Sequence, residues 1–129
     1  MAFNVDIVAL ATANDFFRRV VSTGPNAQVV LMSIPPGGEI GEEVHERVDQ
    51  VLAFVAGEGV AVMEGEASEV GPDRLVHVPA GVRHNVVNRG STDLRLYTIY
   101  APPQHAAGTV HRTKVEADAD EADTFTVPA

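Results

Sequence analysis

Frequent turn signals are the feature that most restricts how this chain folds. Gly, Pro and Asn cluster in short stretches, among them GPN at 24–26, PPGG at 35–38, GPD at 71–73 and PAG at 79–81. Between such stretches lie short runs rich in Val, Ile, Leu and Phe, such as QVVLMSI, QVLAFVA, RLVHV and LRLYTIY. Runs at this spacing are typical of an all-β sandwich or barrel. No helical period is visible before residue 113, apart from a turn of helix near 5–10.

The run VLAFVA at 51–56 is apolar on both faces of the strand that it predicts. Because side chains alternate along a strand, a sheet with one wet side would show a polar residue at every second position. Two apolar faces therefore indicate a sheet that packs on a second sheet on one side and on another partner on the other. We predict that this partner is a second copy of the chain in a homodimer, or else an N-terminal segment of the same chain.

The composition excludes several classes of function. The chain has 129 residues, which fits one domain with a single core, and it has no cysteine, which excludes disulfides, zinc thiolates and thiol nucleophiles. The formal net charge is −9, and without the five acids of EADADEAD at 116–123 it is −9 + 5 = −4. Such a chain has no basic face for nucleic acid or anionic lipid. No apolar run approaches the ~18 residues of a membrane span, so a cytoplasmic protein is expected.

The residues from 112 onward differ in character from the rest of the chain. The segment KVEADADEADTF is polar, acidic and rich in Ala. Such a segment forms either a short helix or a solvated tail. We therefore predict a single folded domain at 1–111, followed by an acidic helix or tail at 112–129.

The stretch GEEVHERVDQ at 41–50 carries several side chains that could meet in one interior. On an unbroken strand Glu43, His45 and Arg47 would share one face, since residues two apart point the same way. A turn in the next two residues would then let Gln50 start the following strand with its side chain in the same interior.

The stretch PAGVRHNVVN adds an imidazole to this set. His84 follows three residues after Gly81, so a turn and a strand would deliver it into the same space. This stretch resembles the second motif of the cupin superfamily, G-x5-P-x-G-x2-H-x3-N. The matching positions are Pro79, Gly81, His84 and Asn88, and Asp73 holds the position of the leading glycine.

The first cupin motif, G-x5-H-x-H-x(3,4)-E-x6-G, is matched in a modified form. In the register that fits every spacing, the matching positions are Gly37, Glu43, His45, Gln50 and Gly57. Glu43 thus replaces the first histidine of the motif, and Gln50 replaces its glutamate. The other register, with His45 as the first histidine, leaves too short a spacing before Gln50.

The resemblance spans residues 27–101 and implies the fold. The cupin fold is a double-stranded β-helix, a small jelly-roll barrel of two facing sheets. We therefore expect an all-β barrel with the motif core at 37–88, a short N-terminal segment and the C-terminal helix or tail. The segment LYTIYAPPQHAAGTVHRTK is also similar to small stand-alone cupins that resemble mannose-6-phosphate isomerase.

Carried over from the resemblance, the metal ligands are Glu43, His45, Gln50 and His84. Two imidazoles and one carboxylate are also the composition of the facial triad that holds non-haem iron(II). Gln50 would add a weak oxygen donor, or a hydrogen bond to a ligand. Iron, manganese, nickel, cobalt, copper and zinc all suit such donors. The resemblance therefore implies one divalent transition metal and a small-molecule substrate, and it identifies neither.

Other polar residues have two open interpretations. Arg47 would bind a substrate anion beside the metal if it faced the interior, or pair with an adjacent acid on the surface. His105 and His111 follow the last strand, where they are either exposed or folded back over the barrel mouth as a general base or a further ligand. Arg47 and His111 are therefore the candidates for catalysis. His77 matches no motif and is expected to be structural.

Three functions are compatible with these residues. The first is a metal-dependent enzyme, an oxygenase or isomerase, in which the metal acts as a Lewis acid or binds dioxygen. The second is a non-catalytic module that senses or stores a small ligand. The third is a metal-free cupin with Glu43 or His84 as the general base and Arg47 as the anion clamp. One fold hosts all of these chemistries, so the resemblance does not choose among them.

Overall fold

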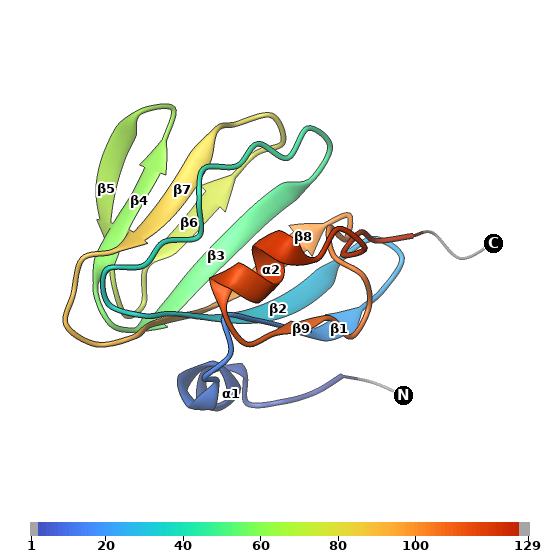
Figure 1. The fold of residues 1–129 in the computed structure, drawn as a ribbon, viewed down its shortest axis with the longest axis horizontal. Coiled ribbons are helices and arrows are strands. Elements are labelled where there is room, and N and C mark those ends of the chain that lie inside the picture. Colours follow the sequence, from blue (N-terminus) through green and yellow to red (C-terminus); the bar gives the residue numbers. More distant parts are fainter. Residues whose placement is uncertain (1–2, 127–129) are drawn as a thin grey trace.

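The computed structural model describes residues 3–126, which form two antiparallel sheets around one core (Figure 1). The larger sheet has the order β6 (Leu75–Val78), β3 (Asp49–Ala56), β8 (Leu94–Ala101), β2 (Gln28–Ile34), β1 (Arg18–Thr23) and β9 (Val110–His111). The smaller sheet has the order β5 (Glu66–Val70), β4 (Gly59–Met63) and β7 (His84–Asn88). The helices of the described residues are α1 (Ile7–Ala13) and α2 (Lys114–Ala119). The prediction of an all-β barrel of two facing sheets is confirmed.

The core lies between the two sheets because the central strands bury every second side chain. In β8 the buried positions, each at most 2% exposed, are Leu94, Leu96, Thr98 and Tyr100. These positions change from apolar to polar along the strand. The neighbouring β3 pairs Phe54 with Leu96 and Gln50 with Tyr100, so it shows the same change. The interior therefore has an apolar end, near Leu96 and Phe54, and a polar end, near Tyr100 and Gln50.

The outer face of the larger sheet is partly covered by α1 (Figure 1). This helix begins after Asp6, whose side chain caps it by accepting a hydrogen bond from Ala9 N at 3.0 Å. It contacts β8, β2 and β3, and Leu31 on β2 is fully buried although it lies outside the main core cluster. An N-terminal segment thus covers part of the second apolar face, as one of the two predictions had it. Leu75 on β6 is 65% exposed, and the homodimer stays a prediction.

The acidic C-terminal segment folds onto the barrel. The strand β9 pairs with β1, and α2 follows it, capped by Thr113, whose hydroxyl accepts from Glu116 N at 3.2 Å. The predicted short helix therefore forms within this segment. After α2 the side chain of Asp123 is only 6% exposed, so the segment is not entirely a solvated tail. Residues 127–129 of the predicted tail lie outside the described residues. Neither helix of the described segment is long and apolar enough to cross a membrane.

Candidate functional site

The four side chains predicted as metal ligands come together at the polar end of the interior. We term them the motif cluster: Glu43, His45, Gln50 and His84. The segment that joins β2 to β3 runs beside β7, where Glu43 N donates to His84 O at 2.9 Å and His84 N donates to Glu43 O at 3.0 Å. Next to this pair, Gly81 N donates to His45 O at 2.8 Å. Backbone pairing therefore places Glu43 and His45 beside His84, and β3 adds Gln50.

The motif cluster consists of two close pairs, each with one imidazole nitrogen and one oxygen. His84 Nε2 lies 3.2 Å from Gln50 Oε1, and His45 Nε2 lies 3.2 Å from Glu43 Oε2. Two atoms that bind one metal ion at ordinary bond lengths lie about 3.0 to 3.4 Å apart, so each pair has the spacing of two ligands. Within residues 3–126, no three His, Asp or Glu side chains are grouped as a metal site. The four side chains therefore form two separate pairs in this structure, and a metal bound by all four would have to draw the pairs together.

Hydrogen bonds around His84 and Gln50 decide which atoms face each other. His84 Nδ1 lies 2.9 Å from Val82 O, and because a carbonyl only accepts, Nδ1 carries the proton. The Gln50 amide nitrogen donates to Thr98 Oγ1 at 3.1 Å and to Tyr100 OH at 3.2 Å, which turns Oε1 toward His84. When His84 is neutral, its Nε2 then presents a lone pair to the lone pairs of Oε1. A cation shared by the two atoms would stabilise this contact.

Burial sets the charge states of the other pair. The pKa of His45 is lowered to about 4, first by burial and then by nearby positive groups, of which His84 is the strongest. His45 is therefore uncharged at neutral pH, and its buried Nε2 has no hydrogen-bond partner among residues 3–126. Burial also raises the pKa of the Glu43 carboxyl, an effect that Arg18 and His84 oppose.

Three polar residues outside both motifs share the polar end: Arg18, Tyr100 and His105. The rings of His45 and Tyr100 meet edge to face with centroids 5.9 Å apart, and Tyr100 meets His105 in the same way at 4.9 Å. Arg18 is only 7% exposed, and its charge acts on His45 and Tyr100. Burial raises the pKa of Tyr100, so its hydroxyl stays protonated at neutral pH. The row of rings therefore joins the motif cluster to the segment after β8.

The histidines after β8 fold back into the barrel, which is one of the two places predicted for them. His105 is 6% exposed and His111 is 3% exposed. His105 Nδ1 lies 2.7 Å from Asp123 Oδ2, and His111 Nε2 lies 2.9 Å from Asp120 Oδ2. Burial alone would raise the pKa of Asp123, but hydrogen bonds, led by the one with His105, lower it to about 2. Both carboxylates belong to the acidic C-terminal segment, which therefore positions two buried histidines.

Arg47 lies outside this interior. A turn at residues 46–47 begins earlier than the sequence indicates, and Arg47 is exposed. No carboxylate lies within ion-pairing distance of it in the described part of the chain, because Asp49 instead contacts His77 and Ala80. Of the two places predicted for Arg47, the structure shows the surface, and the positive charge of the interior belongs to Arg18.

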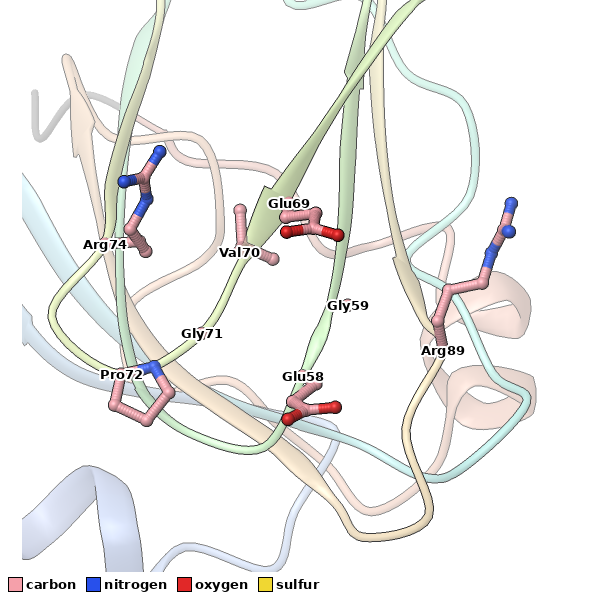
Figure 2. Close-up of a pocket in the computed structure, with 8 residues that line it drawn as sticks. All are labelled: Glu58, Gly59, Glu69, Val70, Gly71, Pro72, Arg74 and Arg89. Carbon is pink, nitrogen blue, oxygen red and sulfur yellow. The ribbon is translucent and has the colours of Figure 1, made fainter.

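A cavity of about 650 Å³ lies away from the motif cluster (Figure 2). Arg74 and Arg89 stand on opposite sides of it, with Glu58 and Glu69 between them. Its lining includes Gly59, which pairs with Asn88 at one end of β7, whereas His84 lies at the other end. At ~3.3 Å per residue, the length of β7 separates this cavity from the motif cluster. The mixed charges of its lining favour no single class of ligand.

Comparisons with known proteins agree with the fold and the motifs. A family model described as the cupin domain matches residues 30–100. The protein YrkC of Bacillus subtilis is 44% identical over 126 residues, which are 92% of this chain and 67% of YrkC. The crystal structure of BH2720 from Bacillus halodurans is 44% identical, with a TM-score of 0.92 over 93% of this chain and 96% of that one. TT1209 from Thermus thermophilus is 27% identical, with a TM-score of 0.68 over 77% of this chain and 96% of that one.

Proposed function

This chain belongs to the cupin family, and we propose that it is a small-molecule-binding cupin in which the motif cluster holds one divalent transition metal. Two imidazoles, a carboxylate and an amide oxygen suit iron, manganese, nickel, cobalt, copper or zinc. The proposal extends to catalysis by an oxygenase or an isomerase. The names of the similar proteins YrkC, BH2720 and TT1209 state no activity, so the proposal rests on the site itself.

The contact between His84 and Gln50 is the observation that carries this proposal. When His84 is uncharged, its bond to the Val82 carbonyl leaves Nε2 with a lone pair, and two hydroxyls turn Gln50 Oε1 toward it at 3.2 Å. Two acceptors at this distance repel each other, since neither has a hydrogen to share. A metal ion bound by both atoms removes the repulsion.

The residues around the motif cluster prepare its donor atoms. A bound divalent ion would supply Lewis-acid chemistry toward an oxygen of the substrate. Val82 fixes the ring nitrogen of His84 that is free to bind, and Thr98 and Tyr100 fix the amide of Gln50. Burial keeps His45 uncharged at neutral pH. One of its two ring nitrogens therefore keeps a lone pair with which it can bind a metal.

Metal analysis tests the proposal. The purified protein is stripped with a chelator, loaded anaerobically with iron(II) or manganese(II), and assayed for metal after gel filtration. We expect about one ion per chain, in line with one imidazole-rich site. His84→Ala is expected to lose the ion, whereas His77→Ala is the matched control, because His77 is half exposed and lies outside the cluster. A wild-type protein without stoichiometric metal after both loadings would contradict the proposal.

A metal-free cupin is the second candidate function, because reversal of the Gln50 amide would satisfy the contact with His84 without a metal. With the amide turned over, its nitrogen donates to His84 Nε2 and its oxygen accepts from Thr98 and Tyr100, so the contact between His84 and Gln50 becomes a hydrogen bond. The absence of a three-residue His, Asp or Glu group within residues 3–126 agrees with this arrangement. The ¹⁵N spectrum of the Gln50 amide separates the two candidates, since only the reversed amide couples across a hydrogen bond to His84.

Oxygen uptake separates an enzyme from a binding module. The metal-loaded protein is assayed against diketones, catechols and small acids, with the His84→Ala variant as the blank. Uptake that needs both the metal and His84 supports an oxygenase. Binding of one of these compounds, detected by calorimetry without turnover, supports a module that senses or stores it.

A further inference from the structure

Arg18 is a buried arginine that the motif cluster does not use. It lies on β1 in phase with the core residue Val20, and its side chain is 8% exposed. Its guanidinium lies over the ring of Phe17, 5.3 Å from the ring centroid. A charge in such a place is costly unless hydrogen bonds and an opposite charge satisfy it.

The partners of this guanidinium among residues 3–126 leave its buried Nε without a hydrogen bond. Nη1 lies 3.4 Å from His111 Nδ1, which is long for a hydrogen bond, and the charge of the guanidinium acts on the Tyr100 hydroxyl. A guanidinium is a planar fork of donors with no acceptor, so oxygen atoms of an anion are its natural complement.

The nearest carboxylate does not supply that complement. Asp123 Oδ2 is 4.0 Å from Arg18 Nη1 but only 2.7 Å from His105 Nδ1. Its other oxygen accepts from Ala106 N at 3.0 Å and from the Thr109 hydroxyl at 3.1 Å. The hydrogen bonds of Asp123 are therefore directed to the segment after β8, and they leave the guanidinium largely unpaired.

His105 presents a second unpaired nitrogen at the same end of the barrel. Its Nδ1 is held by Asp123, and its buried Nε2 has no partner among the described residues. Its backbone is held by buried Gln28, which accepts from His105 N at 3.0 Å and donates to His105 O at 2.8 Å. The ring is therefore fixed from both sides before any ligand arrives, which is how binding groups are preorganised.

Unpaired buried nitrogens gather at the polar end. In residues 3–126, the buried side-chain nitrogen or oxygen atoms without a hydrogen-bond partner are Arg18 Nε, His45 Nε2, His105 Nε2 and Arg95 Nε. All but the last belong to the row that runs from Arg18 through the rings to His45. Buried polar groups in folded proteins are almost always satisfied by the chain, by water or by a ligand, so these nitrogens offer hydrogen bonds that a ligand could complete.

We propose that Arg18, Tyr100 and His105 form an anion subsite beside the motif cluster, and that the small molecule taken up there carries a carboxylate or an enolate oxygen. Arg18 supplies the positive charge and the fork of donors. The Tyr100 hydroxyl and the ring of His105 supply further hydrogen bonds. The inference rests on the proposed function only in assigning the anion to the same ligand; the subsite itself consists of residues that do not hold the metal.

Binding of acetate to the metal-free protein tests the subsite. Protein stripped of metal is titrated with sodium acetate at constant ionic strength, and the ¹H–¹⁵N signals of arginine Nε and of the histidine rings are followed. We expect a saturable shift of the Arg18 Nε signal together with the His105 ring signals. The shift is expected to disappear in Arg18→Gln, to weaken at least tenfold in affinity in Arg18→Lys, and to persist in Arg47→Gln, which removes an exposed arginine.

The outcomes separate this inference from the proposed function. Saturable shifts that survive in Arg18→Gln, or no shift of Arg18 in the wild-type protein up to high acetate concentration, would overturn the subsite. The wild-type titration needs no variant, so a poorly folded Arg18→Gln protein does not remove the test. Acetate binding by a protein that takes up no metal would support the subsite and contradict the metal proposal. Stoichiometric metal without acetate binding would support the metal proposal and contradict the subsite.

Discussion

The two ends of β7 carry two buried polar residues from the same motif, and they differ in how their hydrogen bonds are completed. Asn88 donates to Ile34 O at 2.8 Å and to Thr92 O at 2.9 Å, and it accepts from Gly90 N at 2.8 Å. His84 has one such bond, to Val82 O, while its other nitrogen faces the oxygen of Gln50. A buried polar group with all its partners within the chain holds the fold. A buried polar group that faces another acceptor is instead available to bind a ligand or a metal.

Gly57, the last glycine of the first motif, has a structural role like that of Asn88. Gly57 has φ of +87°, and a Cβ there would lie 2.4 Å from Asp93 O. Only glycine fits such a contact, so its role is to let two loops pass at the apolar end. The cupin motifs therefore combine residues that build the apolar end with residues that equip the polar end.

Substitution of His84 and Asn88 tests whether the two ends of β7 differ in this way, and the Asn88 variant is expected to lose the most stability. Asn88→Ala removes the donor of one buried and one partly buried carbonyl and the acceptor of Gly90 N, and it is expected to cost about 2 to 4 kcal/mol, with metal uptake unchanged. His84→Ala removes one hydrogen bond, to Val82 O, together with the contact between two acceptors, and it is expected to cost about 1 to 2 kcal/mol, while metal uptake is lost. Urea denaturation and metal analysis of both variants measure the two effects. Equal losses of stability would contradict the division between the two ends.

The fold and the motif cluster could be predicted from the sequence because their signals are local. Turn residues and short apolar runs define the strands, and the resemblance to the two cupin motifs implies that Glu43, His45, Gln50 and His84 lie together. Alternation failed for Arg47, since it assumes a strand, and the chain turns at 46–47 instead. A residue pattern carries little information about where a loop between sheets turns.

The rest of the site depends on contacts between distant parts of the chain. Arg18 could have been placed inside by its phase with Val20, because β1 alternates like the other strands. The pairing of His105 with Asp123 could not have been predicted, because it joins the segment after β8 to a segment whose sequence is typical of an acidic tail. Only the folded chain shows that one carboxylate of this tail is buried.

The contribution of Asp123 to stability is expected to depend on pH, and it is smaller than that of Asn88. Its pKa is lowered from the ordinary 3.8 to about 2, so its contacts stabilise the fold above pH 4, and this contribution is lost as the pH falls from 4 through 2. Asp123→Asn is expected to lower stability by about 1 to 2 kcal/mol at pH 7. Denaturation curves between pH 2 and pH 7 should therefore converge with those of the wild type at the acid end. Asp118→Asn, at an exposed position of α2, is the control and should show no such convergence. A difference that stays constant down to pH 2 would contradict the buried pairing with His105.

Thr98 gives the smallest expected effect on stability and the sharpest test of the polar end. It is fully buried, and its hydroxyl accepts from the Gln50 amide at 3.1 Å, a bond that Tyr100 partly duplicates at 3.2 Å. Thr98→Val keeps the shape of the side chain and is expected to change the free energy of unfolding by no more than about 1 kcal/mol. Because Gln50 then loses one of the two contacts that orient it, the affinity for metal is expected to fall about tenfold or more. Metal competition titrations measure this fall, with exposed Thr92→Val as the control. Unchanged metal affinity would mean that the Gln50 oxygen does not bind the metal, and it would favour the reversed amide and the metal-free function.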